Sequence, residues 1–268
     1  MTTLLIDGDT IVWKVLTMTD KKGEVVVHPD DGKLFFDRVV DGYVNTMKRY
    51  FEVTGTLLFL TPDDRSNFRY NLESEVGYKA NRINVPKPVG FLEVKNAVRR
   101  HENCIEEYGL EADDLIAMHA HEYRDSACIV GIDKDYRQCT DTWLWDTRPE
   151  TVPEYSTPLG YLVKRKHILR IKKDGKCEDT YKMYGRGAMW FYYQLLVGDS
   201  SDNIKGASGT GPIKAYELLK TCTSEKDLWN AIQEPYKKQG IERAIENAQL
   251  LWLKKSKDEA PWSPPSAS

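Results

Sequence analysis

The sequence predicts an α/β core in which strands and helices alternate around a mostly parallel central sheet. Three short apolar runs, at residues 3–6, 56–60 and 127–132, each end abruptly in aspartates. Segments with helical periodicity lie between them, at residues 34–51 and 91–107. Ligands bind open sheets of this kind beyond the carboxyl ends of the strands, so the aspartates indicate a functional site.

The later elements are predicted in the same way. Residues 111–122 have the periodicity of a helix with acids in its first turn, which the helix dipole alone would also favour. Residues 162–171 and the bases after them suggest a basic β-hairpin with its turn at Asp174-Gly175. Further helices are expected from residue 191 onwards and over residues 213–219.

Size and composition exclude several classes of protein. The chain has 268 residues, of which 41% are hydrophobic and 29% charged, so it is neither fibrous nor wholly disordered. No apolar run approaches the roughly 18 residues that cross a bilayer, and the start lacks the features of a signal peptide. The five cysteines form no CxxC pair. We therefore expect a cytoplasmic monomer with reduced cysteines and no membrane partner.

The charge distribution bears on the partner. The net charge of −3 argues by itself against nucleic acid. However, bases concentrate in residues 79–100 and 164–176, whereas acids cluster elsewhere in short pairs. This segregation suits a protein that holds cations in one place and a polyanion in another, although either basic run could equally be a solvated face.

The acids at strand ends and helix starts form a candidate metal site. They are Asp7, Asp63, Glu111, Asp113, Asp114, Asp133, Asp135, Asp199 and Asp202. Any one of them could be an ordinary turn or cap residue, but together they would repel one another unless hard divalent cations neutralised them. Oxygen ligands without matching His or Cys indicate Mg²⁺ or Mn²⁺. Two such ions would change the net charge from −3 to +1, and a two-metal carboxylate site suits hydrolysis of a phosphodiester.

Two further motifs suit a phosphate backbone. Tyr78, Lys79 and Arg82 can share a helical face, where the cations would clamp the scissile phosphate and the tyrosine would stack on a base. Gly206, Gly209 and Gly211 precede an apolar helix that carries Lys214. Glycines allow amides to approach a phosphate and the helix N-terminus adds positive potential. The alternatives are that Lys79 and Arg82 only make the surface soluble and that the glycine segment is only a flexible loop.

The motifs LIDGD, GYKANR, LEADDLIA, GIDKDYRQ and VGDSSDNIKGASGTGPIKA resemble the 5′ nuclease family in order and spacing, over roughly residues 3–220. This family includes flap endonucleases, the 5′-nuclease domain of bacterial DNA polymerase I and phage 5′→3′ exonucleases. The segment YKANRINVPKPVGFLE resembles exonucleases of podoviruses, which suggests a phage protein.

The resemblance implies a PIN-like catalytic core over residues 1–198, with a helical arch at about residues 67–100. A helix-three-turn-helix region over residues 199–255 would bind duplex DNA, and residues 256–268 are predicted to be a disordered tail. By motif position the acids named above would be the metal ligands, with Asp64 as the alternative to Asp63.

The resemblance also implies roles for the two motifs that suit a phosphate backbone. Lys79 and Arg82 would activate the phosphate from the arch, and Tyr78 would stack on a base. Gly206, Gly209 and Gly211, with Lys214, would bind duplex backbone around a potassium ion held by main-chain carbonyls.

The predicted activity is metal-dependent 5′→3′ exonuclease or flap endonuclease cleavage of DNA at 5′ ends or flaps. The products would carry 5′-phosphates, and the setting would be phage DNA replication or breakdown of host DNA. Asp7, Asp133 and Asp135 would act with the metals, while Lys79 and Arg82 would stabilise the transferring phosphoryl group. The alternatives are removal of RNA from RNA:DNA hybrids and a structure-specific DNA-binding protein that does not cleave.

Some questions stay open at this point. The basic and aromatic insert at residues 143–190 either enlarges the DNA-binding surface or is an extra structural hairpin. The motifs do not decide whether a 5′ strand threads through the arch or enters an open groove. The histidines, which are scattered, are assigned to structure: His28, His101, His119, His121 and His167.

Overall fold

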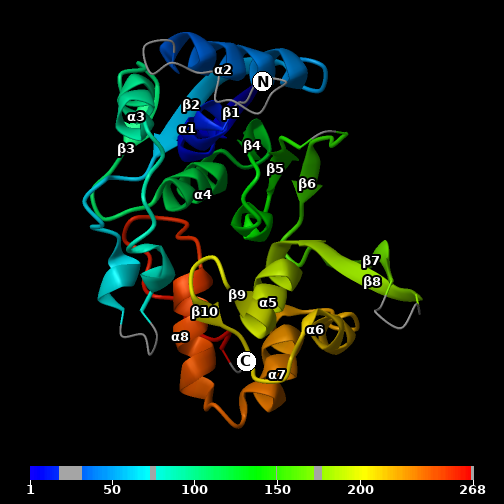
Figure 1. The fold of residues 1–268 in the computed structure, drawn as a ribbon. Helices are drawn as coiled ribbons and strands as arrows, with labels where there is room; N and C mark the ends of the chain where they lie inside the picture. The colour runs from blue at the N-terminus through cyan, green and yellow to red at the C-terminus, as the bar shows by residue number, and fades with distance from the viewer. Residues whose placement is uncertain (18–31, 73–76, 149, 172–176, 267–268) are drawn as a thin grey trace. The chain divides into compact units, whose positions relative to one another are not determined.

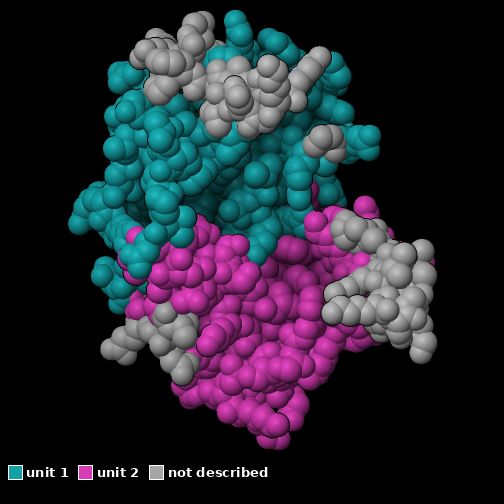
Figure 2. All heavy atoms as spheres, in the orientation of Figure 1, with its two compact units in different colours: residues 1–71, 84–155, 253–259 teal, residues 72–83, 156–252, 260–268 magenta. Residues whose placement is uncertain are grey.

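The computed structural model describes residues 1–17, 32–72, 77–148, 150–171 and 177–266. The chain divides into two units, shown in different colours in Figure 2. The first unit consists of residues 1–71, 84–155 and 253–259, and the second of residues 72–83, 156–252 and 260–268. This division differs from the predicted boundary after residue 198, because the hairpin and the helix after it group with the C-terminal helices.

The first unit is built on a six-stranded sheet with the order β3-β2-β1-β4-β5-β6 (Figure 1). Its elements are β1 (Thr2–Asp7), α1 (Gly8–Leu16), α2 (Gly32–Met47), β2 (Val53–Leu60), η2 (Phe68–Asn71), α3 (Phe91–Arg99), β3 (Cys104–Glu106), α4 (Ala112–Tyr123), η4 (Arg124–Ser126), β4 (Ala127–Gly131), η5 (Asp135–Gln138), β5 (Thr142–Asp146) and β6 (Glu154–Ser156), which ends at the boundary of the unit. Strand β1 runs parallel to β2 and β4, β2 to β3, and β4 to β5. The prediction of an α/β fold with a mostly parallel sheet is therefore confirmed.

Both faces of this sheet are covered, which explains why its strands are continuous apolar runs. Leu4 and Ile6 point to one face and pack with residues of α1, α2 and α3. Leu5 points to the other face and packs with residues of α4. The alternation follows from the period of two along a strand. Because these strands are parallel, the carboxyl ends of β1, β2 and β4 lie at the same edge of the sheet.

The predicted helix at residues 91–107 ends at Arg99 in the structure, so nearly half of it, residues 100–107, was predicted wrongly. After Arg99 the chain turns at His101 and enters β3, where Cys104 pairs with Leu58 of β2. Pairing with a strand end far away in sequence satisfies the backbone groups that a longer helix would have satisfied. Over residues 67–72 and 77–100, the predicted arch, the described helices are η2, η3 (Ala80–Arg82) and α3.

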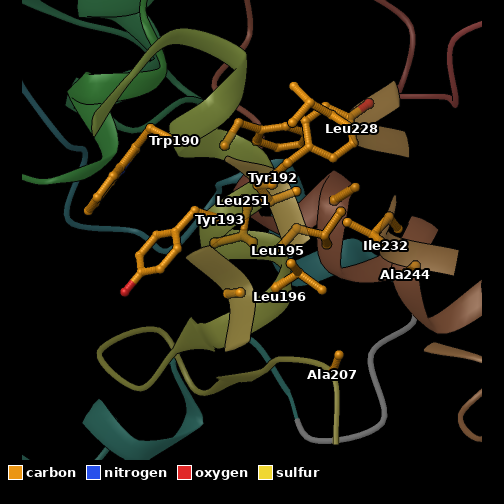
Figure 3. Close-up of a cluster of buried hydrophobic side chains, with 14 of the residues drawn as sticks. Trp190, Tyr192, Tyr193, Leu195, Leu196, Ala207, Leu228, Ile232, Ala244 and Leu251 are labelled. Carbon is orange, nitrogen blue, oxygen red and sulfur yellow. The ribbon is translucent and has the colours of Figure 1, made fainter. Parts of the chain in front are cut away.

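The second unit is mainly helical around a buried cluster that includes Trp190, Leu195 and Leu228 (Figure 3). Its elements are η3, β7 (Tyr161–Ile171), β8 (Cys177–Arg186), α5 (Gly187–Val197), β9 (Gly198–Asp199), β10 (Ile204–Lys205), α6 (Pro212–Leu219), α7 (Glu225–Tyr236) and α8 (Ile241–Leu251). Strands β7 and β8 form the predicted antiparallel hairpin, whose predicted turn at Asp174-Gly175 lies outside the described residues. Helix α5 is apolar on almost every side, which is typical of a central core helix.

The C-terminal segment differs from the prediction of a disordered tail. Trp262 is 7% exposed and belongs to the core of the second unit. Its ring centroid lies 5.7 Å from that of Phe191 and 5.6 Å from that of Trp229, and its carbonyl oxygen accepts a hydrogen bond from Gln249. The prediction is therefore wrong for this residue, because the composition of the segment did not reveal the contact of its one aromatic ring.

None of the helices within the described ranges has the length and apolar character that a membrane span requires.

Candidate active site

Asp7 stands where strand β1 passes directly into helix α1, and it caps that helix. Its Oδ1 accepts a hydrogen bond from the backbone N–H of Thr10 at 2.9 Å, and its Oδ2 accepts one from the Thr10 hydroxyl at 2.6 Å. Oδ2 also accepts a hydrogen bond from the hydroxyl of Tyr136 at 2.9 Å. The side chain is buried, so this carboxylate is fixed by the start of a helix and by a neighbouring loop.

Tyr136 lies close to several acids of the first unit. The ring can approach because β4 ends in Gly131, where an added Cβ would lie 2.8 Å from Tyr136 Cε2. Burial, together with the charges of Asp7, Asp113 and Asp133, raises the pKa of the Tyr136 hydroxyl far above its ordinary value. These three carboxylates therefore lie within electrostatic reach of one side chain at the carboxyl edge of the sheet.

Asp133 and Asp135 follow the end of strand β4. Asp133 is exposed and its Oδ1 accepts a hydrogen bond from the backbone N–H of Asp135 at 2.9 Å. Asp135 is buried and begins the short helix η5 that carries Tyr136. Both acids thus lie at the predicted strand end, and the turn between them presents Asp133 to solvent beside Asp7.

Asp9 belongs to the same group, and sequence reasoning missed it. Burial and the charge of Glu111 raise the pKa of its carboxyl, against the opposing effect of Thr61 and Lys95. Its Oδ2 accepts a hydrogen bond from the backbone N–H of Thr61, at the end of β2, at 3.1 Å. The Thr61 hydroxyl in turn accepts one from the N–H of Ala112, the first residue of α4. The available signal was the position of Asp9 in LIDGD, within the first turn of the helix that Asp7 caps.

The electrostatics of the group fit divalent cations. Burial, followed by the charge of Asp9, raises the pKa of Asp7 to about 6, and Asp133 adds to the shift despite the hydrogen bonds from Thr10. Burial and acidic neighbours make this carboxyl costly to ionise, and a bound hard cation would offset that cost. This cluster would offer a metal only carboxylate oxygens as ligands, which suits Mg²⁺ or Mn²⁺. Its members are Asp7, Asp9, Glu111, Asp113 and Asp133.

Asp114 occupies a different position from its neighbours on α4. It is fully buried, and Arg69 binds it through two hydrogen bonds of 2.6 Å and 2.8 Å. Arg69 Nη1 also lies 3.5 Å from Oε2 of Glu111, which caps the helix. In this structure Asp114 is the counter-charge of a buried arginine, and the pair holds Glu111 in place. Arg69 was not predicted, because its partner lies 45 residues away along the chain.

The structure places Asp63 in an ion-pair network. Lys95 Nζ lies 2.6 Å from its Oδ1, and an Arg99 nitrogen lies 2.8 Å from its Oδ2. Partial burial would raise the pKa of Asp63, but the hydrogen bonds and charges of the two cations outweigh it and lower that pKa. The alternative, Asp64, is exposed and accepts a hydrogen bond from the N–H of Ser66. The choice between the two as ligand stays a prediction.

In the second unit, the predicted cations gather around the predicted ligand Asp202. Arg82 donates to its Oδ1 at 2.8 Å, Lys79 Nζ lies 3.8 Å from its Oδ2, and the Tyr78 hydroxyl donates to Oδ2 at 3.1 Å. Lys79 has a φ of 51° and its backbone N–H donates to the Asp202 carbonyl, so the three residues share a turn rather than a helical face. Tyr78 is 6% exposed, which does not match the predicted stacking on a base.

Asp199, the other predicted ligand of this unit, is buried and accepts a hydrogen bond from the N–H of Ser201 at 2.8 Å. It thus supports the same turn, residues 199–203, that carries Asp202. That Asp199 and Asp202 act with the acids of the first unit stays a prediction from the sequence.

The glycine loop leads from β10 into helix α6. Gly206 allows no side chain, since an added Cβ would lie 2.3 Å from the Leu196 carbonyl oxygen. Around Gly209, which has a φ of 69°, and Gly211, the N-cap of α6, no described atom lies within 4 Å of an added Cβ. Lys214 Nζ lies 3.5 Å from the Gly209 carbonyl oxygen. One glycine is therefore required by packing, whereas the other two leave the backbone open to a ligand.

The raised pKa of Asp7 predicts that metal-free protein loses stability as the pH rises from about 4 to about 6. A carboxyl with a raised pKa holds its proton more tightly in the folded state, so its contribution is complete at low pH and is lost on ionisation. A shift from 3.8 to about 6 corresponds to about 3 kcal/mol. Denaturant unfolding with chelator should show this decline in the wild type and a much smaller one in Asp7→Asn. Equal pH dependence in both proteins would contradict the prediction.

A mostly parallel α/β sheet with a carboxylate cluster at its strand ends is typical of metal-dependent phosphodiesterases. The sequence matches the family model of the 5′-3′ exonuclease, N-terminal resolvase-like domain, over residues 2–159. Because this match covers more than half of the chain, the chain belongs to the 5′-3′ exonuclease family.

Curated relatives agree with this assignment. The chain is 31% identical to the 5′-3′ exonuclease of Mycoplasma pneumoniae over 163 residues, 57% of this chain and 49% of the relative. It is 29% identical to flap endonuclease Xni of Shewanella halifaxensis over 184 residues, 65% of each protein. It is 24% identical to the exonuclease of Escherichia phage T7, over 78% of this chain and 63% of the relative. The chain thus spans about half of the first relative's length.

Solved structures show the same fold. The zinc-bound 5′-exonuclease of T5 has a TM-score of 0.61 and 16% identity, covering 93% of this chain and 88% of that one. The T5 D15 protein co-crystallised with metal ions has a TM-score of 0.58 and 16% identity, covering 94% and 89%. At this identity the likeness concerns the fold.

Proposed function

We propose that this protein is a divalent-metal-dependent 5′ nuclease that hydrolyses DNA phosphodiesters at 5′ ends or flaps and leaves 5′-phosphates. The observation that carries the proposal is the carboxylate cluster of the first unit, Asp7, Asp9, Glu111, Asp113 and Asp133. Its members come from the ends of β1 and β4 and the starts of α1 and α4. Membership of the 5′-3′ exonuclease family supports this reading.

The cluster residues would hold one or two Mg²⁺ or Mn²⁺ ions, which supply hydroxide for attack and neutralise charge on the phosphate. Tyr136 and Thr10 orient Asp7 through their hydrogen bonds. Thr61 fixes Asp9 and the start of α4 together. Asp135, Asp199 and Asp202 are proposed as further ligands from their motif positions alone.

The test is cleavage of a 5′-labelled DNA duplex with a single-stranded flap, beside the blunt duplex, in Mg²⁺ and in chelator. Cleavage that requires the metal supports the proposal, and the product lengths separate flap cutting from stepwise exonuclease action. Failure to cleave in any divalent metal, with DNA still bound, favours a binding protein without nuclease activity. An RNA:DNA hybrid included as a third substrate tests the ribonuclease H-type alternative.

Lys79→Ala is expected to slow cleavage on the order of hundreds-fold while metal binding is retained, since a cation that stabilises the transferring phosphoryl group would be lost. The contact with Asp202 makes a second readout necessary, because removing Lys79 also removes an ion pair. Lys79→Arg keeps the charge and should restore part of the rate. A rate unchanged in Lys79→Ala would remove this residue from the proposed mechanism.

Gly211→Val is expected to weaken binding to every duplex sequence alike, because a side chain at this N-cap would keep phosphates away from the amides of α6. The native φ of −86° is accessible to valine and no described atom lies within 4 Å of the new Cβ, so the fold should tolerate it. Gly42→Ala in α2, also without a neighbour, is the control. Equal affinities in duplex titrations of the two variants would argue against a duplex site here.

We also propose a potassium ion at this loop. Thr210 is buried, and its hydroxyl oxygen has no hydrogen-bond partner among the described groups, so it is an available ligand beside the main-chain carbonyls. The wider setting that we propose is phage DNA replication or host-DNA breakdown in the bacterial cytoplasm, by a monomer. Within the described part of the chain, Cys104, Cys128, Cys139 and Cys222 form no disulfide bond.

A further inference from the structure

One face of the hairpin β7–β8 packs on the helices of its own unit, and the other face is exposed at Arg165 and Lys182. Leu162 and Met183 are buried in the core of the second unit, and Lys164, on the same face, lies 3.4 Å from Glu217 of α6. Residues that face each other across the two strands lie on the same side of a hairpin. The opposite face is therefore defined by the register pairs Val163 with Tyr184 and Arg165 with Lys182.

Two cations are held together on this opposite face. Arg165 and Lys182 are both exposed and are direct register partners. The guanidinium carbon of Arg165 lies 5.2 Å from the centroid of the Tyr184 ring, and Lys182 Nζ lies 5.6 Å from it. The tyrosine thus fixes two positive charges side by side at the surface.

Neither cation has an ion-pair partner among the residues that the structure describes. Lys164 and Lys166, their neighbours in β7, form ion pairs with Glu217 and Asp179. By contrast, no carboxylate within the described ranges pairs with Arg165 or Lys182. Like charges directly opposite each other on paired strands destabilise a hairpin. A surface that retains this repulsion is suited to an anionic partner with regularly spaced charges.

We propose that Arg165 and Lys182, positioned by Tyr184, bind the phosphate backbone of the double-stranded part of the DNA substrate. This inference rests on the proposed nuclease function and extends it to the insert that the motifs left unassigned. The Tyr184 ring is partly buried and has cations over it, which favours phosphate contact over stacking on a base. Strand β7 and helix α6, which follows the glycine loop, belong to the same unit and contact each other. The cation pair would therefore extend the duplex-binding surface proposed for the glycine loop to the hairpin.

The decisive variant is Arg165→Gln with Lys182→Gln, compared with Lys48→Gln with Arg49→Gln. The second pair removes the same charges from exposed neighbouring positions after α2. Binding of labelled duplex DNA is measured in chelator over a series of salt concentrations. Loss of two phosphate contacts should lower the slope of log affinity against log salt by about 2 and weaken binding at least about tenfold. The control pair should match the wild type.

A charge-retaining swap, Arg165→Lys with Lys182→Arg, separates electrostatics from folding and should bind nearly as tightly as the wild type. Thermal unfolding of the glutamine variant should start no lower than that of the wild type, since the repulsion between strands is relieved. A salt slope equal to that of the control pair would overturn the inference, as would a loss of affinity confined to single-stranded DNA.

Cleavage of the flap substrate by the wild type is scored separately. If the wild type cleaves and the hairpin variant binds normally, only this inference fails. If the wild type does not cleave but the slope changes as expected, the nuclease proposal fails and the binding surface stands. A wild type that binds no duplex at all would overturn both.

Discussion

Asp133→Ala is expected to reduce metal-dependent DNA cleavage on the order of a thousandfold or more, while duplex binding persists. Asp133 is exposed at the carboxyl end of β4, and its charge acts on both Asp7 and Tyr136. Removing it takes away a proposed cation ligand and relieves repulsion in the cluster. Stability in chelator should therefore be retained or slightly increased, and initial rates over a range of Mg²⁺ concentrations provide the measurement.

The matched control is Asp125→Ala. Asp125 is also an exposed aspartate, but it precedes the amino end of the same strand, in η4. It should cleave at the wild-type rate. If Asp133→Ala cleaves as fast as this control, the cluster is not the catalytic site, and the carboxylates at the strand ends need another explanation.

Asp114→Ala is expected to lower the unfolding free energy of metal-free protein by about 3–5 kcal/mol, because the buried guanidinium of Arg69 loses both hydrogen bonds to this carboxylate and keeps only the more distant charge of Glu111. The double variant Arg69→Met with Asp114→Leu removes both charges and should be much closer to the wild type. Asp179→Ala, which breaks the exposed pair with Lys166, should change stability little. Denaturant unfolding in chelator measures all three.

The same experiment separates two roles for Asp114. As a metal ligand only, which the motif position predicted, Asp114 would matter for cleavage but hardly for the stability of metal-free protein. As the partner of Arg69 it stabilises the fold whether or not metal is present. A full-stability Asp114→Ala protein in chelator would contradict the structural role and favour the metal-ligand prediction.

The sequence predicted the strand ends well because an apolar run followed by an aspartate is a local signal. Asp7 and Asp133 were found in this way, and the structure places their charges close together. Arg69 was missed because it lies in a short 3₁₀ turn without periodicity and its contact is long-range. Tyr78 was predicted only to stack on a base, since no local pattern reveals that its hydroxyl donates to Asp202, 124 residues later.

Trp262 was missed for the same reason, and its position has a consequence for how the protein is made. The core of the second unit contains both Tyr78 and Trp262, and residues 253–259 belong to the first unit. Each unit is built from segments that lie far apart along the chain, so neither unit is complete before its last segment has been synthesised. The two units therefore cannot fold one after the other during synthesis, as consecutive domains of a chain can, because both need segments from the last part of the described chain.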